Sequence, residues 1–310
     1  MSRYLAGRIG QAIPVLFGVT LITFLLTHIA LGDPVRAMMG QRADPEVMAR
    51  IRTEYGLDKP VWDRYTLYMA KVLVGDLGYS YRQDRPVTDV VAERLPATVR
   101  LAVAAMLVAM VLGLAAGTIA AMRHNTLWDL CMMILSLLGI STPVFWLGMM
   151  LILLFAVWLG WFPISGYGDG AFRHLVLPAL TLGALQAGYI ARMTRSALLE
   201  VLRQEYIRTA RAKGLREGVV ILKHGLRNGI LPVLTLAGIG LGDLLVGAPL
   251  TETVFGWPGL GRLLVAAVGN RDLPVVMGAT LLFALIYLGA NLLVDLGYAL
   301  VDPRVRLLKR

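Results

Sequence analysis

One basic segment of this sequence, 205–228, reads EYIRTARAKGLREGVVILKHGLRN and carries charged side chains suited to binding a partner. Its six basic residues are Arg208, Arg211, Lys213, Arg216, Lys223 and Arg227. Such a cluster can bind nucleic acid, lie on an anionic membrane surface or dock another protein. Nucleic acid is disfavoured, because the cluster lacks the interleaved aromatic residues on which bases stack.

Sequence patterns typical of enzymes are absent. The chain has no G-x-x-x-x-G-K-[ST] loop to cradle nucleotide phosphates, no H-E-x-x-H motif and no G-x-S-x-G nucleophile turn. Scattered positions of the histidines and the single cysteine argue against a metal site or a disulfide: His28, His124, Cys131, His174 and His224. We therefore expect a non-catalytic protein with no cofactor of its own.

The composition is that of a protein embedded in lipid. Of the 310 residues, 57% are hydrophobic and 16% are charged, and the mean hydropathy is +0.67. An ordinary soluble domain carries about 25% charged residues. The formal net charge of +10 is the kind of excess that marks cytoplasmic loops of membrane proteins.

Six apolar segments are long enough to cross a bilayer, which takes roughly 20 residues per helix. Five runs contain no Asp, Glu, Lys or Arg: 9–32, 101–122, 130–168, 174–191 and 273–294. A sixth, 228–251, is interrupted only by Asp243. With their flanks, the predicted spans are 9–31, 98–122, 128–160, 174–194, 229–250 and 275–300. The fold class predicted is an all-α integral membrane protein with six transmembrane helices.

The longest run leaves two interpretations open, because 130–168 could hold one helix or two, and Pro143 can kink or break it. The positive-inside rule favours one span. With the basic N-terminus inside, four crossings return the chain to the cytoplasm by residue 192, so the Arg-rich loop 195–228 is cytoplasmic, and six crossings place the basic C-terminus there too. Both termini are therefore predicted to be cytoplasmic.

Two extramembrane features complete the predicted topology. The first apolar stretch is longer than the roughly 7–15 residues of a signal-peptide core, so an uncleaved anchor is the better interpretation. Residues 32–96 form the largest loop, and their turn signals indicate a small helical cap on the extracytoplasmic side. No internal repeat or second domain is evident, and 1–310 is taken as one domain.

Two acidic residues lie inside predicted spans, where a charge is costly and a functional role is the first expectation. Asp243 is central in the fifth span and has many glycines around it, so we expect it to line a polar pathway, with a structural hydrogen bond as the alternative. Asp295 is close to the cytoplasmic end of the sixth span, where pairing with a basic residue is the simpler expectation.

The pattern of the basic segment indicates two short helices. Tyr206, Ile207 and Ala210 share one helical face, Gly214 is a natural helix stop, and a second helix can begin near Glu217. At the cytoplasmic surface, the predicted shape is a compact knob.

This segment resembles the coupling loop of the permease subunits of binding-protein-dependent ABC importers, in the branch that carries dipeptides, oligopeptides, glutathione and nickel. Arg208-Thr209-Ala210 and Gly214 stand where that family has EAA-x-x-x-G, with Arg208 in place of Glu, and His224 to Asn228 stand where many members have I-x-L-P. Further runs match in order: LGDP at 31–34, GDLG at 75–78, TETVF at 251–255, WPGLGR at 257–262, NLLVD at 291–295 and DPR at 302–304.

The resemblance implies a type I importer permease fold in the cell (inner) membrane. It also implies a pathway shared with a second homologous permease, two ABC ATPases that bind the ATP, an extracytoplasmic substrate-binding protein, and contact with membrane lipid. The residues it assigns to ATPase coupling are Arg208, Thr209, Ala210, Gly214, His224, Leu226 and Arg227.

The expected function is thus ATP-driven import of short peptides. A nickel or metal-chelate importer is the nearest alternative, since an acid such as Asp243 suits a cationic cargo. A secondary transporter or membrane enzyme is the more distant one, and such transporters usually carry inverted repeats, which this chain does not show.

Overall fold

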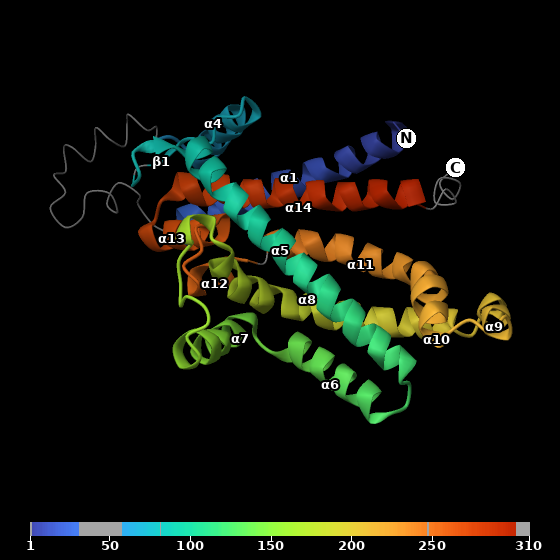
Figure 1. The fold of residues 1–310 in the computed structure, drawn as a ribbon. Coiled ribbons are helices and arrows are strands. Elements are labelled where there is room, and N and C mark those ends of the chain that lie inside the picture. Colours follow the sequence, from blue (N-terminus) through green and yellow to red (C-terminus); the bar gives the residue numbers. More distant parts are fainter. Residues whose placement is uncertain (1, 31–57, 81, 247, 302–310) are drawn as a thin grey trace. The chain divides into compact units, whose positions relative to one another are not determined.

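The computed structural model describes residues 2–30, 58–80, 82–246 and 248–301, and these residues form helices and one small two-stranded sheet (Figure 1). Within these described ranges, five helices are long and apolar enough to cross a membrane, and the number rises to six when one bent helix pair is counted as a single span. The predicted all-α membrane fold is confirmed. The chain divides into two compact units, which are described separately.

The first unit comprises residues 1–98 and 258–288. Its elements are α1 (Ser2–Ala30), α4 (Val61–Leu73), β1 (Tyr79–Ser80), β2 (Arg85–Pro86), the start of α5 (Val87–Met122), α13 (Leu260–Asn270) and most of α14 (Leu273–Val301). The two strands pair antiparallel, with Ser80 opposite Arg85.

Buried hydrogen bonds join distant parts of this unit. The hydroxyl groups of Thr20 in α1 and Tyr65 in α4 lie 3.0 Å apart. At the start of α13, the backbone N–H of Leu260 donates to the hydroxyl of Thr98 over 2.8 Å. The Ser80 hydroxyl donates to the carboxylate of Asp272, directly before α14, over 2.5 Å. These bonds give buried polar groups the partners that they lose on leaving water, although Oδ1 of Asp272 has no hydrogen-bond partner among the described residues.

The second unit comprises residues 99–257 and 289–310. Its further elements are α6 (Leu127–Ser141), α7 (Val144–Leu151), the π-helix η2 (Ile152–Trp158), the 3-10 turn η3 (Gly168–Gly170), α8 (Phe172–Val201), α9 (Glu205–Ala212), α10 (Glu217–Val219), the π-helix η4 (Val220–Gly225), α11 (Leu226–Val246) and α12 (Pro249–Val254).

Helix α8 is the centre of this unit, and α6, α7 and α11 all pack against it (Figure 1). Glycines permit the close approach. A Cβ at Gly183 would lie 2.6 Å from the carbonyl oxygen of Ala105 in α5, and a Cβ at Gly139 of α6 would lie 2.9 Å from that of Ala184. A Cβ at Gly240 of α11 would lie 2.8 Å from Gln186 Oε1. These small residues let helix backbones approach closely, as membrane helices commonly do.

Several helices extend beyond the predicted spans. Helix α5 begins at Val87, well before 98, and α8 continues to Val201, beyond 194. Around Pro143 the chain turns by 109° between α6 and the helix pair α7 and η2. Pro143 has no N–H to continue the helix, and Thr142 before it is extended, as residues preceding proline tend to be. Whether 128–160 forms one span stays a prediction.

The predicted cap falls partly outside the described residues, since 31–57 is not described. Its remainder contains α4 and the hairpin β1–β2, so it is not purely helical. Gly78, next to β1, has a φ of +89°, a conformation that glycine adopts without strain. Strands of two residues leave almost no periodic signal, which is why the sequence does not predict the hairpin.

Candidate coupling site

Helix α9 is attached to its surroundings through its apolar side. Ile207 is fully buried, Ala210 is 7% exposed, and both pack in one cluster with the buried Val220 of η4. Val201 and Leu202, where α8 ends, pack against the same cluster. Fully burying a side chain such as Ile207 is worth about 1.5–3 kcal/mol. Of the three residues predicted to share the apolar face, Ile207 and Ala210 therefore fasten α9 to the end of α8, whereas Tyr206 is exposed.

The turn that joins α8 to α9 is short and hydrogen-bonded throughout. It consists of Leu202, Arg203 and Gln204, and each of their backbone N–H groups donates to a carbonyl of α8, at 2.8, 3.3 and 3.0 Å. The carbonyl of Gln204 in turn accepts from the N–H of Ile207 over 3.1 Å. A turn with its backbone groups so bonded has few soft torsions left, and α9 is held at a defined angle to α8.

Gly214 ends α9 in the way predicted. Its φ is +76°, a left-handed conformation that favours glycine, and no atom of the chain lies within 4 Å of where its Cβ would be. Across this turn Arg211 donates two hydrogen bonds to the Glu217 carboxylate, at 2.6 and 3.2 Å. The carboxylate raises the pKa of the Arg211 guanidinium above its usual value. Gly214 thus presents bare backbone at an open surface between two paired charges.

The first residues of the predicted motif point outward. Arg208 has a 71% exposed side chain and donates to the exposed Glu205 carboxylate over 2.8 Å. The Thr209 hydroxyl donates to the carbonyl of Glu205 over 3.1 Å. An exposed ion pair one turn apart on a helix contributes at most about 1 kcal/mol. Arg208 and Thr209 are therefore free to rearrange against a partner without unfolding α9.

The other predicted residues lie where the loop returns to the membrane. His224 belongs to η4, Leu226 is the first residue of α11, and Arg227 is exposed. The Asn228 side-chain amide donates to the Tyr206 hydroxyl of α9 over 2.8 Å. The structure therefore brings both halves of the predicted site together in one small knob. It connects to α8 through the apolar cluster and to α11 through Tyr206 and Asn228.

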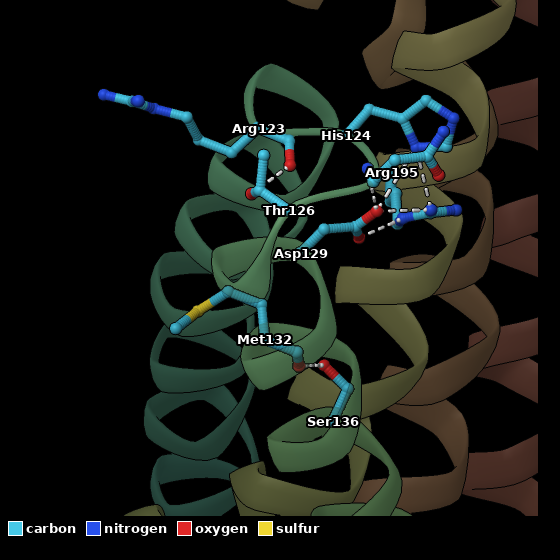
Figure 2. Close-up of polar contacts among 8 residues, drawn as sticks. Arg123, His124, Thr126, Asp129, Met132, Ser136 and Arg195 are labelled. Carbon is cyan, nitrogen blue, oxygen red and sulfur yellow. Dashed lines mark hydrogen bonds and ion pairs between the residues drawn. The ribbon is translucent and has the colours of Figure 1, made fainter.

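A second polar cluster has no counterpart among the predicted site residues. Figure 2 shows Asp129, at the start of α6, facing Arg195 of α8. Arg195 donates from Nε to Oδ1 over 2.6 Å and from a terminal nitrogen to Oδ2 over 2.7 Å. Nδ1 of His124 lies 3.2 Å from Asp129 Oδ2 and 3.1 Å from that Arg195 nitrogen. The only sequence signal for this cluster is an acid at the edge of an apolar run.

Asp243 lies on the exposed side of α11. Gly240 and Gly242 beside it are buried, and Gly240 faces Gln186 of α8, so close helix packing explains at least this glycine. An exposed carboxylate within an apolar helix is costly against lipid and therefore needs a polar neighbour. Asp295 lies within α14, but its side chain is outside the described residues.

Metal binding by this chain has no support in the described ranges, where no group of three or more His, Cys, Asp or Glu side chains could hold an ion. Each described histidine lies in a different element or turn. What the candidate site does contain is two exposed ion pairs, Arg208 with Glu205 and Arg211 with Glu217.

Comparisons with known proteins cover the whole chain. Residues 113–307 match the family described as the inner membrane component of binding-protein-dependent transport systems, and residues 1–102 match the N-terminal part of such membrane components. The chain is 45% identical to the di/tripeptide transport system permease protein DppB of Pseudomonas aeruginosa (strain UCBPP-PA14), with 99% of both chains covered.

Two further relatives carry related names. The dipeptide transport system permease protein DppB of Escherichia coli (strain K12) and the glutathione transport system permease protein GsiC of the same strain are each 44% identical, with 99% of each chain covered. Among solved structures, the inward-facing MetNI methionine ABC transporter matches at 20% identity with a TM-score of 0.52, covering 66% of this chain and 95% of that one. At that identity the likeness concerns the fold alone.

Proposed function

Since the chain belongs to the family of inner membrane components of binding-protein-dependent transport systems, we propose that it is the permease subunit of an ATP-driven importer of short peptides. It is a multi-pass protein of the inner membrane, and its family is one of permeases rather than enzymes. Full-length relatives at 41–45% identity are named for di/tripeptide, dipeptide and glutathione transport, which supports a peptide cargo.

The observation that carries the coupling part of this proposal is the exposed knob formed by α9 and the Gly214 turn. Its outer surface offers small residues and exchangeable charges, while Ile207 and Ala210 fasten it to α8. Such a surface suits a cleft on a cytoplasmic ATPase. A push on α9 would reach α8 through the apolar cluster and α11 through Tyr206 and Asn228.

The remaining partners follow from the same family. We expect a second homologous permease to complete the pathway, two ATPases to bind and hydrolyse ATP, and an extracytoplasmic binding protein to deliver the peptide. Both termini and the knob would lie in the cytoplasm, as the basic residues predict. This chain would hold no cofactor, since the ATP sites belong to the ATPases.

The coupling assignment is tested at Gly214 in the reconstituted importer. Gly214→Val puts a branched side chain on left-handed backbone, whereas Gly214→Asn adds bulk but tolerates that conformation. Uptake stimulated by ATP is expected to fall at least about tenfold for Gly214→Val, the fall that 1.4 kcal/mol produces. If Gly214→Asn retains uptake, glycine is required at this position for its backbone conformation. If Gly214→Asn loses uptake, glycine is required because the ATPase approaches closely.

The matched control is Gly218→Ala, at an exposed glycine of the same loop. Gly218 is not in the left-handed region, and no atom of the chain lies within 4 Å of the position that the new Cβ would take. Uptake by this variant is expected to equal that of the wild type. If Gly214→Val also transported at the wild-type rate with normal ATP hydrolysis, the knob would not be the coupling element.

A nickel or metal-chelate cargo is the second candidate, favoured by one observation. Asp243 presents a carboxylate on the exposed side of an otherwise apolar helix, and carboxylate oxygens attract cations. A peptide carries its own ammonium group, so the same carboxylate suits either cargo. The two are separated by the charge dependence of transport, considered in the Discussion.

A further inference from the structure

We propose that the pair Asp129–Arg195 makes α6 move together with α8, and so carries motion of α9 into a second membrane helix. This inference rests on the coupling role proposed for α9. Asp129 and Arg195 would be positioning residues, because neither lies in the knob itself. The two residues are 66 positions apart in the chain, and both come from elements of the same compact unit.

The pair has the geometry of a strong and specific joint. Two parallel hydrogen bonds of 2.6 and 2.7 Å link the guanidinium to both carboxylate oxygens. Asp129 is only 5% exposed, so water competes little for these bonds. A bidentate arginine–carboxylate pair fixes distance and orientation together, which a lysine at the same place cannot do.

The turn between α5 and α6 is shaped around the same carboxylate. The backbone N–H of Asn125 donates to Asp129 Oδ2 over 3.1 Å, and Asn125 holds a left-handed φ of +60° to do so. A neutral His124 ring can accept a hydrogen bond at Nδ1 from Arg195, 3.1 Å away. In Figure 2 both His124 and Arg195 point toward Asp129, whereas Arg123 points away. The Arg195 side chain and the Asn125 backbone N–H therefore both hold the Asp129 carboxylate at the first turn of α6.

Arg195 is connected to the knob without interruption. Helix α8 continues from Arg195 to Val201, and the hydrogen-bonded turn 202–204 leads directly into α9. Further along, α6 touches α8 through Gly139 and Gly188, whose Cβ positions would meet Ala184 and Ile140. These packing contacts hold the two helices together without directional bonds, and the ion pair adds bonds of defined direction at the first turn of α6.

A purely structural pair would behave differently from a joint. Loss of a structural pair would lower the amount of folded complex and leave the remaining molecules normal. If the pair instead couples the two helices, its loss leaves α6 packed on α8 but allows α6 to shift relative to α8. Fewer peptides are then transported for each ATP hydrolysed. The number of peptides transported per ATP distinguishes these cases, because it is independent of the amount of complex.

The experiment compares Arg195→Gln, Arg195→Lys and a control in the assembled importer. Arg195→Gln is expected to lower the transport per ATP about fivefold, within the range for residues that couple distant sites. Arg195→Lys keeps the positive charge but cannot make the bidentate contact, so its transport per ATP should lie between those of the wild type and Arg195→Gln. The control is Arg85→Gln, which removes an exposed arginine that also bonds Glu93 twice, in the first unit.

A distance measurement tests the motion itself. Cys131, the single cysteine of the chain, is exposed on α6 two residues after Asp129, and Arg203→Cys adds a label in the turn after α8. With cysteine-free partner subunits, the distance between spin labels should be single and equal with and without an ATP analogue. In Arg195→Gln the distribution of distances between the labels should broaden, or the distance should change when the ATP analogue binds.

The proposal is overturned if Arg195→Gln transports as many peptides per ATP as the wild type. It is also overturned if that ratio falls while the distance between labels stays as in the wild type. Absence of ATP-driven uptake by the wild-type complex would instead contradict the proposed function, and the label distance would still test whether α6 follows α8.

Discussion

At the scale of single residues, the glycines of α8 decide how closely its neighbours approach. We predict that Gly183→Ala destabilises the chain by about 1–3 kcal/mol, the usual cost of overpacking, because the new Cβ would lie 2.6 Å from the backbone oxygen of Ala105. Backbone cannot rotate aside as a side chain can. Thermal unfolding of the purified protein in detergent measures the effect.

The matched substitution is Gly269→Ala in α13, where nothing lies within 4 Å of the added Cβ. There the better helix propensity of alanine should leave stability unchanged or slightly higher. Equal midpoints for the two variants would show that α5 and α8 can separate without loss, contrary to the packing described.

At the scale of elements, the first turn of α14 carries a pH-dependent contribution to stability. Burial raises the pKa of Asp272 above its ordinary 3.8, although hydrogen bonds from Ser80 and from the backbone of Val275 oppose this. The folded state then binds the proton more tightly than the unfolded state. The stability that this group contributes is therefore fully present below pH 3.8 and is lost as pH rises through the raised folded-state pKa.

Asp272→Asn should remove this dependence, so the unfolding midpoint of the wild type, relative to that of the variant, should be higher below pH 3.8 than at neutral pH. Asparagine still accepts a backbone hydrogen bond at a helix start, which keeps the comparison fair. Asp58→Asn, at an exposed acid of the first unit, controls for general loss of a carboxylate. A difference that does not change with pH would contradict the assignment.

Elements also show what sequence could and could not predict. Apolar runs and the stop at Gly214 are local signals, so spans and the two-helix knob could be located from them. The bidentate contact of Asp129 with Arg195 depends on how α6 lies against α8, and no spacing in the chain encodes it. Likewise Pro143 indicates a break, but no local signal encodes the size of the 109° turn, after which α7 packs on α8 and α12.

At the scale of the whole molecule, cargo is the property to test, and Asp243 is the residue that separates the candidates. In the complete importer, Asp243→Asn is expected to lower uptake of a cationic peptide more than that of an anionic one, by roughly fivefold, since one exposed charge pair contributes up to about 1 kcal/mol. Uptake of labelled peptides that differ only in charge, with nickel ions as a third cargo, provides the measurement.

Ile239→Asn is the control, because Ile239 is also exposed on α11 and the change alters polarity without removing a charge. Equal effects of Asp243→Asn on all cargoes would remove Asp243 from selectivity. Transport of nickel but of no peptide would replace the peptide importer with the metal importer.

The short turn after α8 has a consequence for timing. All three of its backbone N–H groups are bonded to α8. A flexible linker would instead change conformation within nanoseconds to microseconds and would transmit a displacement only in part. A rigid turn transmits a displacement of α9 to α8 in full and without delay. Under the proposed coupling, the membrane helices would keep step with the ATPases, and the slowest event of each cycle would belong to the nucleotide or the cargo rather than to the connection between them.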